Sequence, residues 1–320
     1  MYGGTVLSAT SVDANNGMYP IAIYICREGR MKEWEKFLAI IPPLLKDTKR
    51  AITFFTTSRM VRHWNLKSIS YVYVFDASNV LECCPYRISE KALDAAKSYN
   101  RVYHEWNLIN LSELQRRWVE ACGKSSWARH SYDLSARCPQ MVNIFSKAFN
   151  LWITELKCLP ICQFIMGFEA KLIQLFLTRR RNGRLWKDER IVPRASAKLG
   201  DQILHKRLYH ASSRPVWRNN FINLVTNICN KPSRNVNLLL RTCDYGKWQI
   251  SGVPCVHDVA VIAQHRHRPP FYEKYVDEYF IVGKYMASYA GIIYQTPGMT
   301  ESLQVAGINP PPLKNIIHLS

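Results

Sequence analysis

The chain has 320 residues, of which 48% are hydrophobic and 12% aromatic, with 14 glycines and 16 prolines. This composition excludes a disordered or collagen-like chain and is sufficient for one large domain or two smaller ones. Lysine and arginine number 43 against 24 acidic residues, so the formal net charge is +19. Such an excess is unusual for an enzyme that acts on small metabolites and indicates a polyanionic partner, most commonly nucleic acid. We therefore expect DNA as the partner and no small-molecule substrate.

The cysteines and the hydropathy pattern bear on the cellular compartment. Ten cysteines in a chain of this length do not indicate a disulfide scaffold. The first 25 residues lack a basic segment followed by an apolar one, so we expect no signal peptide. We find no run of about 18 apolar residues and expect no membrane span. A reducing compartment is expected, with the cysteines present as thiols or metal ligands.

The first 60 residues show the pattern of an α/β domain. Two apolar runs flank a cluster of Asp, Asn and Gly residues that suits a tight turn. A helical apolar stripe follows, and Pro42-Pro43 should end that helix because proline cannot donate a backbone hydrogen bond. The sequence predicts strands at 5–10, 20–26 and 52–56, a turn at 13–17 and a helix with its stripe at Trp34, Phe37, Leu38 and Ile41.

The middle of the chain has helical character, and the pattern changes again near residue 214. Apolar residues at helical spacing predict helices at 88–98, 102–122, 142–157 and 161–181. Two apolar runs then predict paired strands at 221–225 and 236–240, joined by a loop at 229–235. The last stretch, 307–314, contains three consecutive prolines and should be extended.

Two cysteines and a histidine carry the sharpest local signal. Cys255 and His257 follow a Gly-Val-Pro turn and begin a predicted helix at 257–263, and Cys243 precedes them by twelve residues. Zinc prefers four Cys or His ligands in a tetrahedron, and a C-x-H pair at the entry to a helix can supply two. On its own, such a pair is a weak signal and more often represents a buried cysteine beside a surface histidine.

The wider spacing resembles the SWIM zinc finger, above all the form found in plant Mutator-like transposases, which is roughly C-x-C-x-x-W-x-x-x-G-x-P-C-x-H. The matching residues are Cys243, Trp248, Gly252, Pro254, Cys255 and His257. The resemblance implies Zn²⁺ bound by Cys243, Cys255 and His257. The family's second cysteine falls on Tyr245, and a protonated phenol is a poor zinc ligand. We expect a weakened site whose fourth ligand is Asp244, Cys229 or water.

The resemblance to Mutator-like transposases extends along nearly the whole chain, including the segments at 2–22, 33–38 and 275–285. It implies a fold of α/β plus α class. Its expected parts are a truncated ribonuclease-H-like core at 1–87, a helical insertion at 88–210, a small ββα SWIM region at 214–290 and an extended tail at 291–320.

The catalytic carboxylates of the family are not matched. These transposases cut DNA with three carboxylates that hold divalent metal ions. The first would lie upstream of Met1, the second falls on Ser58 and the third falls on Lys147. A cation at a metal-ligand position repels the ion, so we expect no catalytic residues and no transposase activity. Asp13 and Asp76 remain as lone carboxylates near turns, where we expect solvent-exposed groups.

A basic stretch at the end of the fourth predicted helix is the candidate DNA contact. Its residues are Arg179, Arg180, Arg181, Arg184 and Lys187. Contacts of such residues with phosphates give affinity but little sequence choice. The same stretch also fits a solvated helix end or a nuclear-import signal.

The sequence thus favours a transposon-derived, zinc-binding and DNA-binding protein of the nucleus that has lost catalysis. Two alternatives stay open at this point. One is an active metal-dependent nuclease or transposase that uses carboxylates outside the recognised pattern. The other is a decayed gene product without a stable function.

Overall fold

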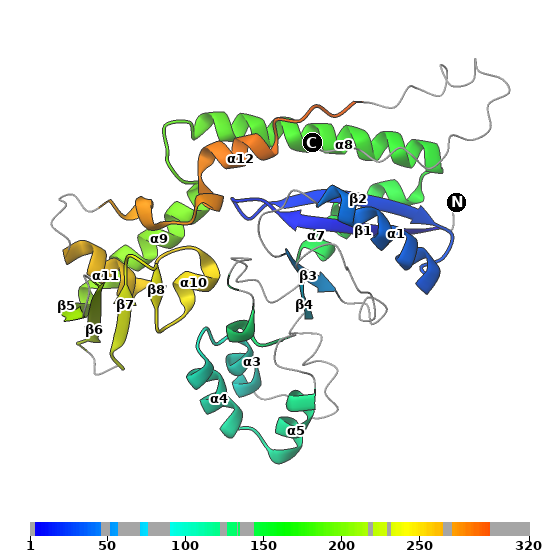
Figure 1. The fold of residues 1–320 in the computed structure, drawn as a ribbon. Helices are drawn as coiled ribbons and strands as arrows, with labels where there is room; N and C mark the ends of the chain where they lie inside the picture. The colour runs from blue at the N-terminus through cyan, green and yellow to red at the C-terminus, as the bar shows by residue number, and fades with distance from the viewer. Residues whose placement is uncertain are drawn as a thin grey trace, which may run out of the picture. The chain divides into compact units, whose positions relative to one another are not determined.

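The computed structural model describes residues 4–45, 52–56, 71–75, 90–121, 127–132, 134, 144–216, 220–228, 232–264 and 271–294. Helices and strands are mixed along the chain, as the sequence predicts (Figure 1). The chain forms two compact units, each built from separate segments. Unit 1 comprises residues 1–47, 144–192 and 281–320, and unit 2 comprises residues 48–143 and 193–280.

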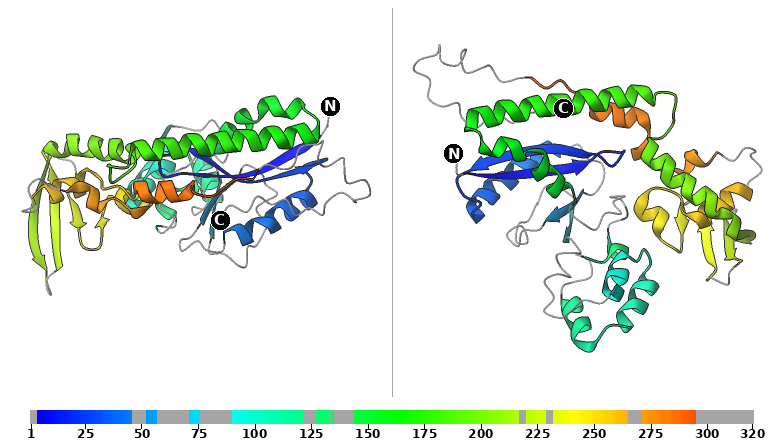
Figure 2. Two further views of the ribbon diagram at one scale, coloured as in Figure 1. Left: turned by 90° about the horizontal axis from the view of Figure 1, so that it is seen from above. Right: turned by 180° about the vertical axis from the view of Figure 1, so that it is seen from behind.

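Unit 1 contains a β-hairpin and the longest helix among the described residues. Its elements are β1 (Thr5–Val12), β2 (Met18–Cys26), α1 (Met31–Leu44), α7 (Ile144–Trp152), the 3₁₀ helix η4 (Thr154–Cys158), α8 (Ile161–Leu185) and α12 (Val282–Ser288). Helices α1 and α7 pack against the hairpin, and α12 packs against α8. Figure 2 shows α8 running along the length of the hairpin.

Unit 2 contains a parallel strand pair, a helical cluster and an antiparallel sheet. The first part holds β3 (Ile52–Thr56), β4 (Tyr71–Phe75), α3 (Glu90–Lys97), α4 (Arg101–Ile109), α5 (Glu113–Ala121) and η2 (Arg129–Ser131). The second part holds α9 (Pro193–His205), η5 (Lys206–Leu208), β5 (Tyr209–Val216), β6 (Asn220–Asn227), β7 (Arg234–Asn237), β8 (Thr242–Cys243), α10 (Lys247–Ser251), α11 (Val256–Gln264), η6 (Tyr272–Tyr275) and η7 (Glu278–Phe280).

The β1–β2 hairpin confirms the first two predicted strands and the turn between them. The two strands pair antiparallel, and Asn16 in the turn has a φ of 64°, which asparagine tolerates better than most residues. Asp13 does not lie in solvent as we expected: it is only 6% exposed. The reason is local, because its carboxylate accepts hydrogen bonds from the backbone N–H groups of Asn15 (2.9 Å) and Gly17 (2.6 Å) and so turns inward.

Long-range contacts complete the surroundings of Asp13. The hydroxyl of Tyr289 donates a hydrogen bond of 2.7 Å to Asp13 Oδ2, and Arg179 Nε lies 3.8 Å from the same oxygen. The ring of Tyr289 packs against Tyr19 and Phe176 with centroid distances of 5.4 and 5.1 Å. The Asp13 carboxylate therefore links the hairpin to α8 and to the segment after α12.

Two helices differ from the sequence prediction: one ends later than expected, and one is divided into two. Helix α1 continues through Pro42-Pro43 and ends at Leu44, so the prolines, which cannot donate to the carbonyls one turn earlier, end the helix slightly later than expected. The single helix predicted at 102–122 is divided into α4 and α5. At the break, Ser112 N–H donates to Gln115 Oε1 (3.2 Å) and Gln115 N–H donates to Ser112 Oγ (3.3 Å). This reciprocal capping box starts a new helix.

Helix α8 is the one helix in the described part of the chain that is long and apolar enough to cross a membrane by length and composition. Its residues Phe164, Phe168, Leu172 and Phe176 recur every four positions and are buried within unit 1. In the middle of the helix, Lys171 pairs with Glu155. This amphipathic pattern favours the interpretation of α8 as a packing helix of the unit.

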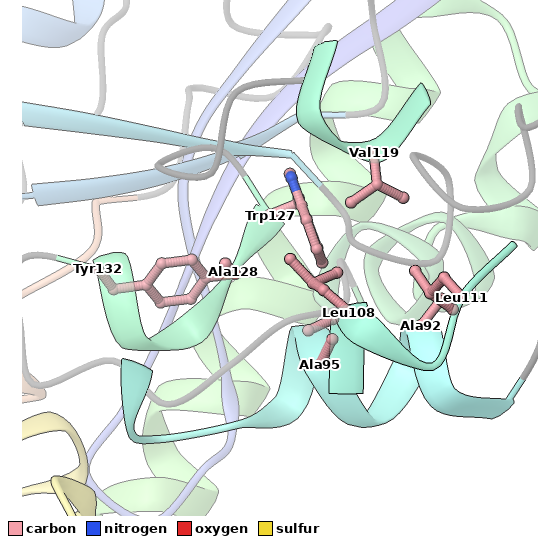
Figure 3. Close-up of a cluster of buried hydrophobic side chains, with 9 residues drawn as sticks. Ala92, Ala95, Leu108, Leu111, Val119, Trp127, Ala128 and Tyr132 are labelled. Carbon is pink, nitrogen blue, oxygen red and sulfur yellow. The ribbon is translucent and has the colours of Figure 1, made fainter. Parts of the chain in front are cut away.

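The helical cluster of unit 2 has its own hydrophobic core. Small side chains on α3 (Ala92, Ala95 and Ala96) allow α4 to approach closely. Figure 3 shows Trp127 and Leu108 pointing toward each other in this core.

The third predicted strand, β3, is confirmed, and it pairs in parallel with β4.

The antiparallel sheet of unit 2 has the strand order β5-β6-β7-β8. The predicted pairing of the two strands near 221–225 and 236–240 is confirmed by β6 and β7, although β7 ends at Asn237. Helix α11 packs on β5, β6 and β7 and confirms the short helix predicted after Cys255. The core between sheet and helix contains Ala211, Val225, Val236, Cys243, Cys255, Ala260 and Val261.

Candidate metal centre

Cys243 lies on the short edge strand β8, where it pairs with Val236 of β7. The side-chain amide of Gln249 holds the backbone of Cys243 from both sides. Gln249 Oε1 accepts from the Cys243 N–H at 3.3 Å, and Gln249 Nε2 donates to the Cys243 carbonyl at 2.9 Å. The carbonyl also accepts from Gly246 N–H at 2.8 Å. The backbone that carries the first thiol is thereby fixed.

Cys255 and His257 lie at the start of α11, which begins after Cys255. The glycine and the tryptophan of the motif, Gly252 and Trp248, have structural roles here. Gly252 has a φ of 71°, and a Cβ at this position would lie 2.8 Å from Asp277 Cβ. The indole of Trp248 is buried and donates to the Tyr275 carbonyl at 3.2 Å. These contacts set the path of the chain between the two cysteines.

The three predicted metal ligands converge. The two sulfurs are 3.7 Å apart, and His257 Nδ1 lies 3.3 Å from Cys255 Sγ and 3.9 Å from Cys243 Sγ. With Zn–S of about 2.3 Å and Zn–N of about 2.0 Å, a tetrahedral site separates two sulfurs by about 3.8 Å and a sulfur from a nitrogen by about 3.5 Å. The donor atoms therefore have the spacing that a tetrahedral zinc ion requires, and the cluster could hold a metal ion.

Burial changes the pKa values of the candidate ligand side chains. Cys243, Cys255 and His257 are all buried. Burial raises the pKa of the Cys255 thiol well above its ordinary value. Burial, with Arg234 and Lys247 nearby, lowers the pKa of His257 to about 4. The imidazole is therefore neutral at pH 7, which is the form that binds metals.

The fourth position of the tetrahedron is not filled by Tyr245. Its ring packs edge-on against the ring of His257, with centroids 5.5 Å apart, and against Tyr99. Burial raises the pKa of the Tyr245 phenol above its ordinary value, so it stays protonated. Asp244 is exposed, and its Oδ2 accepts from the backbone and side-chain N–H groups of Asn235 at 3.1 and 2.8 Å. Cys229 lies outside the described residues.

Asp258 is a group at the centre that the sequence interpretation missed. Its side chain is fully buried, and its Oδ2 accepts a hydrogen bond of 2.7 Å from the backbone N–H of Cys255. Its carboxylate also lies close enough to the thiols of Cys243 and Cys255 to act on them electrostatically. Burial raises the pKa of Asp258 to about 7. A signal was present in the sequence, because an acidic residue three positions after a helix N-cap commonly bonds back to it.

The basic stretch at the end of α8 divides into two groups. Arg179 contacts Asp13, and Arg180 donates hydrogen bonds to the carbonyls of Tyr289 and Gly291. These two side chains therefore hold unit 1 together. The other three predicted DNA contacts, Arg181, Arg184 and Lys187, are exposed.

The two positions at which the resemblance to transposases would place carboxylates carry lysine and serine. Lys147 is exposed on α7, and Ser58 lies outside the described residues, as does Asp76. Within the described ranges, the cysteine–histidine cluster is the one group of potential metal ligands.

Comparisons of the chain with protein-family models, with curated proteins and with solved structures found no match. The geometry of the centre and the charge of the chain are therefore the basis for a functional conclusion.

Proposed function

We propose that this chain is a zinc-binding, DNA-binding protein of the nucleus, derived from a Mutator-like transposase and without transposase activity. The observation that carries the proposal is the convergence of Cys243, Cys255 and His257 at distances that suit tetrahedral zinc. Two thiols and an imidazole select zinc over magnesium or calcium, because the sulfur ligands are soft. The metal would tie β8 to the start of α11 and so stabilise the sheet.

DNA binding is supported by the net charge of +19 and by the exposed cations at the end of α8. The exposed cations at the end of α8 are Arg181, Arg184 and Lys187, and they can neutralise DNA phosphates. Binding through them would leave the contacts of Arg179 and Arg180 within unit 1 unchanged. Such binding depends on the release of counterions and has little sequence preference.

We expect the triple variant Arg181→Ala, Arg184→Ala, Lys187→Ala to bind duplex DNA more weakly and with less dependence on salt. Loss of three phosphate contacts lowers the slope of log K against log[salt] by about 2.7. A matched control is Arg27→Ala, Lys32→Ala, Lys147→Ala, which removes the same charge from exposed positions of unit 1. The measurement is a fluorescence titration from about 50 to 200 mM salt. Equal losses in both triple variants would show that the end of α8 is not the DNA contact.

Metal-dependent DNA cleavage is expected to be absent. The lysine at position 147 presents a positive charge where the resembling transposases hold a metal ion by a carboxylate. The measurement is incubation of labelled transposon ends with the purified chain and Mg²⁺ or Mn²⁺. Reproducible nicking that EDTA abolishes would contradict this prediction.

A further inference from the structure

The carboxylate of Asp258 has one oxygen with a clear structural role and one without. Oδ2 accepts the N–H of Cys255, the residue before α11, and so caps the start of the helix. Oδ1 is buried and makes no hydrogen bond among the described residues. A buried acceptor without a partner is destabilising, so such an atom calls for an explanation.

The surroundings of this free oxygen point to a metal. Asp258 follows His257 directly, its Oδ2 bonds to the backbone of Cys255, and its carboxylate lies close enough to the thiols of Cys243 and Cys255 to act on them electrostatically. Two thiolates already balance the charge of a zinc ion, and a carboxylate adds one negative charge. The ammonium of Lys247 lies close enough to Asp258 and His257 to act on both electrostatically, and it can compensate that charge.

We propose that Asp258 supplies the fourth zinc ligand through Oδ1, in place of the thiolate that the SWIM pattern would have at Tyr245. This inference rests on the proposed zinc binding. The donor atoms of Cys243, Cys255 and His257 lie within 4.8 Å of one another, and the Asp258 oxygens are not part of that group. The ligand role therefore requires a rotation of the Asp258 side chain when the metal binds.

The test is a double-mutant cycle between Asp258→Asn and Tyr245→Cys, with zinc affinity measured by competition against a chromophoric chelator. Asparagine keeps an oxygen that can accept from the Cys255 N–H, so the helix cap is retained, but it is a poor zinc ligand. We expect Asp258→Asn alone to weaken zinc binding at least about tenfold. In the Tyr245→Cys background, where a thiolate takes the fourth position, the same change should have little effect.

A second readout and a control make the outcome specific. With Co²⁺ in place of zinc, Asp258→Asn should alter the visible absorption bands, which report the ligand set, while the circular dichroism of the protein stays unchanged. Asp244→Asn, at the exposed neighbour of Cys243, should leave affinity and spectrum unchanged. An equal loss in both backgrounds, or no loss in either, would overturn the inference. If the wild type binds no zinc at all, the proposed zinc binding itself fails.

Discussion

Replacing Tyr245 by cysteine is expected to tighten zinc binding by about 100-fold or more, because a soft thiolate joins the two thiolates and the imidazole already in place. Cys243 and position 245 then form the C-x-C pair of a complete SWIM finger. The measurement is chelator competition, together with the rise in melting temperature at saturating zinc, which follows the affinity.

Tyr245→Ser is the matched control for this experiment. It removes the same aromatic contacts with Tyr99 and His257 but adds no thiolate. Its zinc affinity should not exceed that of the wild type. If the wild type and Tyr245→Cys both fail to bind zinc, the spacing of the three donor atoms has no functional meaning.

Replacing Asp13 by alanine is expected to lower the free energy of unfolding of unit 1 by about 3–5 kcal/mol, the range for a buried charge pair that loses one partner. The change leaves the buried hydroxyl of Tyr289 without its acceptor and Arg179 without its carboxylate. It also removes the bonds that hold the turn at Asn15 and Gly17. Urea denaturation followed by circular dichroism measures the effect as a lower midpoint.

Two further variants separate the contributions to that loss. Asp13→Asn keeps an acceptor but loses the charge, so its effect should be smaller. Glu28→Ala breaks an exposed ion pair with Arg30 in the same unit and should leave the midpoint unchanged. If Asp13→Ala behaves like Glu28→Ala, the carboxylate does not stabilise the unit.

The sequence was sufficient to predict those elements that depend on residues close to one another along the chain. The Asp-Asn-Gly turn at 13–17 and the apolar runs beside it were sufficient for the hairpin, and the C-x-H spacing was sufficient for the start of α11. The three candidate metal ligands could be named because the motif fixes their separation along the chain. The break at Ser112 was missed although its capping box is also local, because the apolar spacing continues across it.

The remaining features depend on partners that are distant in the sequence. Nothing near Arg180 indicates that its guanidinium binds carbonyls at Tyr289 and Gly291. Likewise, the turn accounts for the bonds of Asp13 to Asn15 and Gly17, but nothing near it indicates that a tyrosine 276 positions later donates to the same carboxylate. The bond from the Cys255 N–H to Asp258 could have been read from their spacing, but the complete burial of the carboxylate depends on the packing of α11 against the sheet.

The interleaving of the two units has a consequence for folding during synthesis. The chain passes from unit 1 to unit 2 and back twice, so neither unit is contiguous. All segments of unit 2 have been synthesised once Phe280 is complete, but unit 1 still lacks α12 and Tyr289. Completing the fold of unit 1 then requires contacts between residues from opposite ends of the chain. Contacts between residues so far apart in sequence form slowly. The segments of unit 2, which contains the candidate metal centre, are therefore all synthesised first, and the N-terminal hairpin is the element whose last packing partner is synthesised latest.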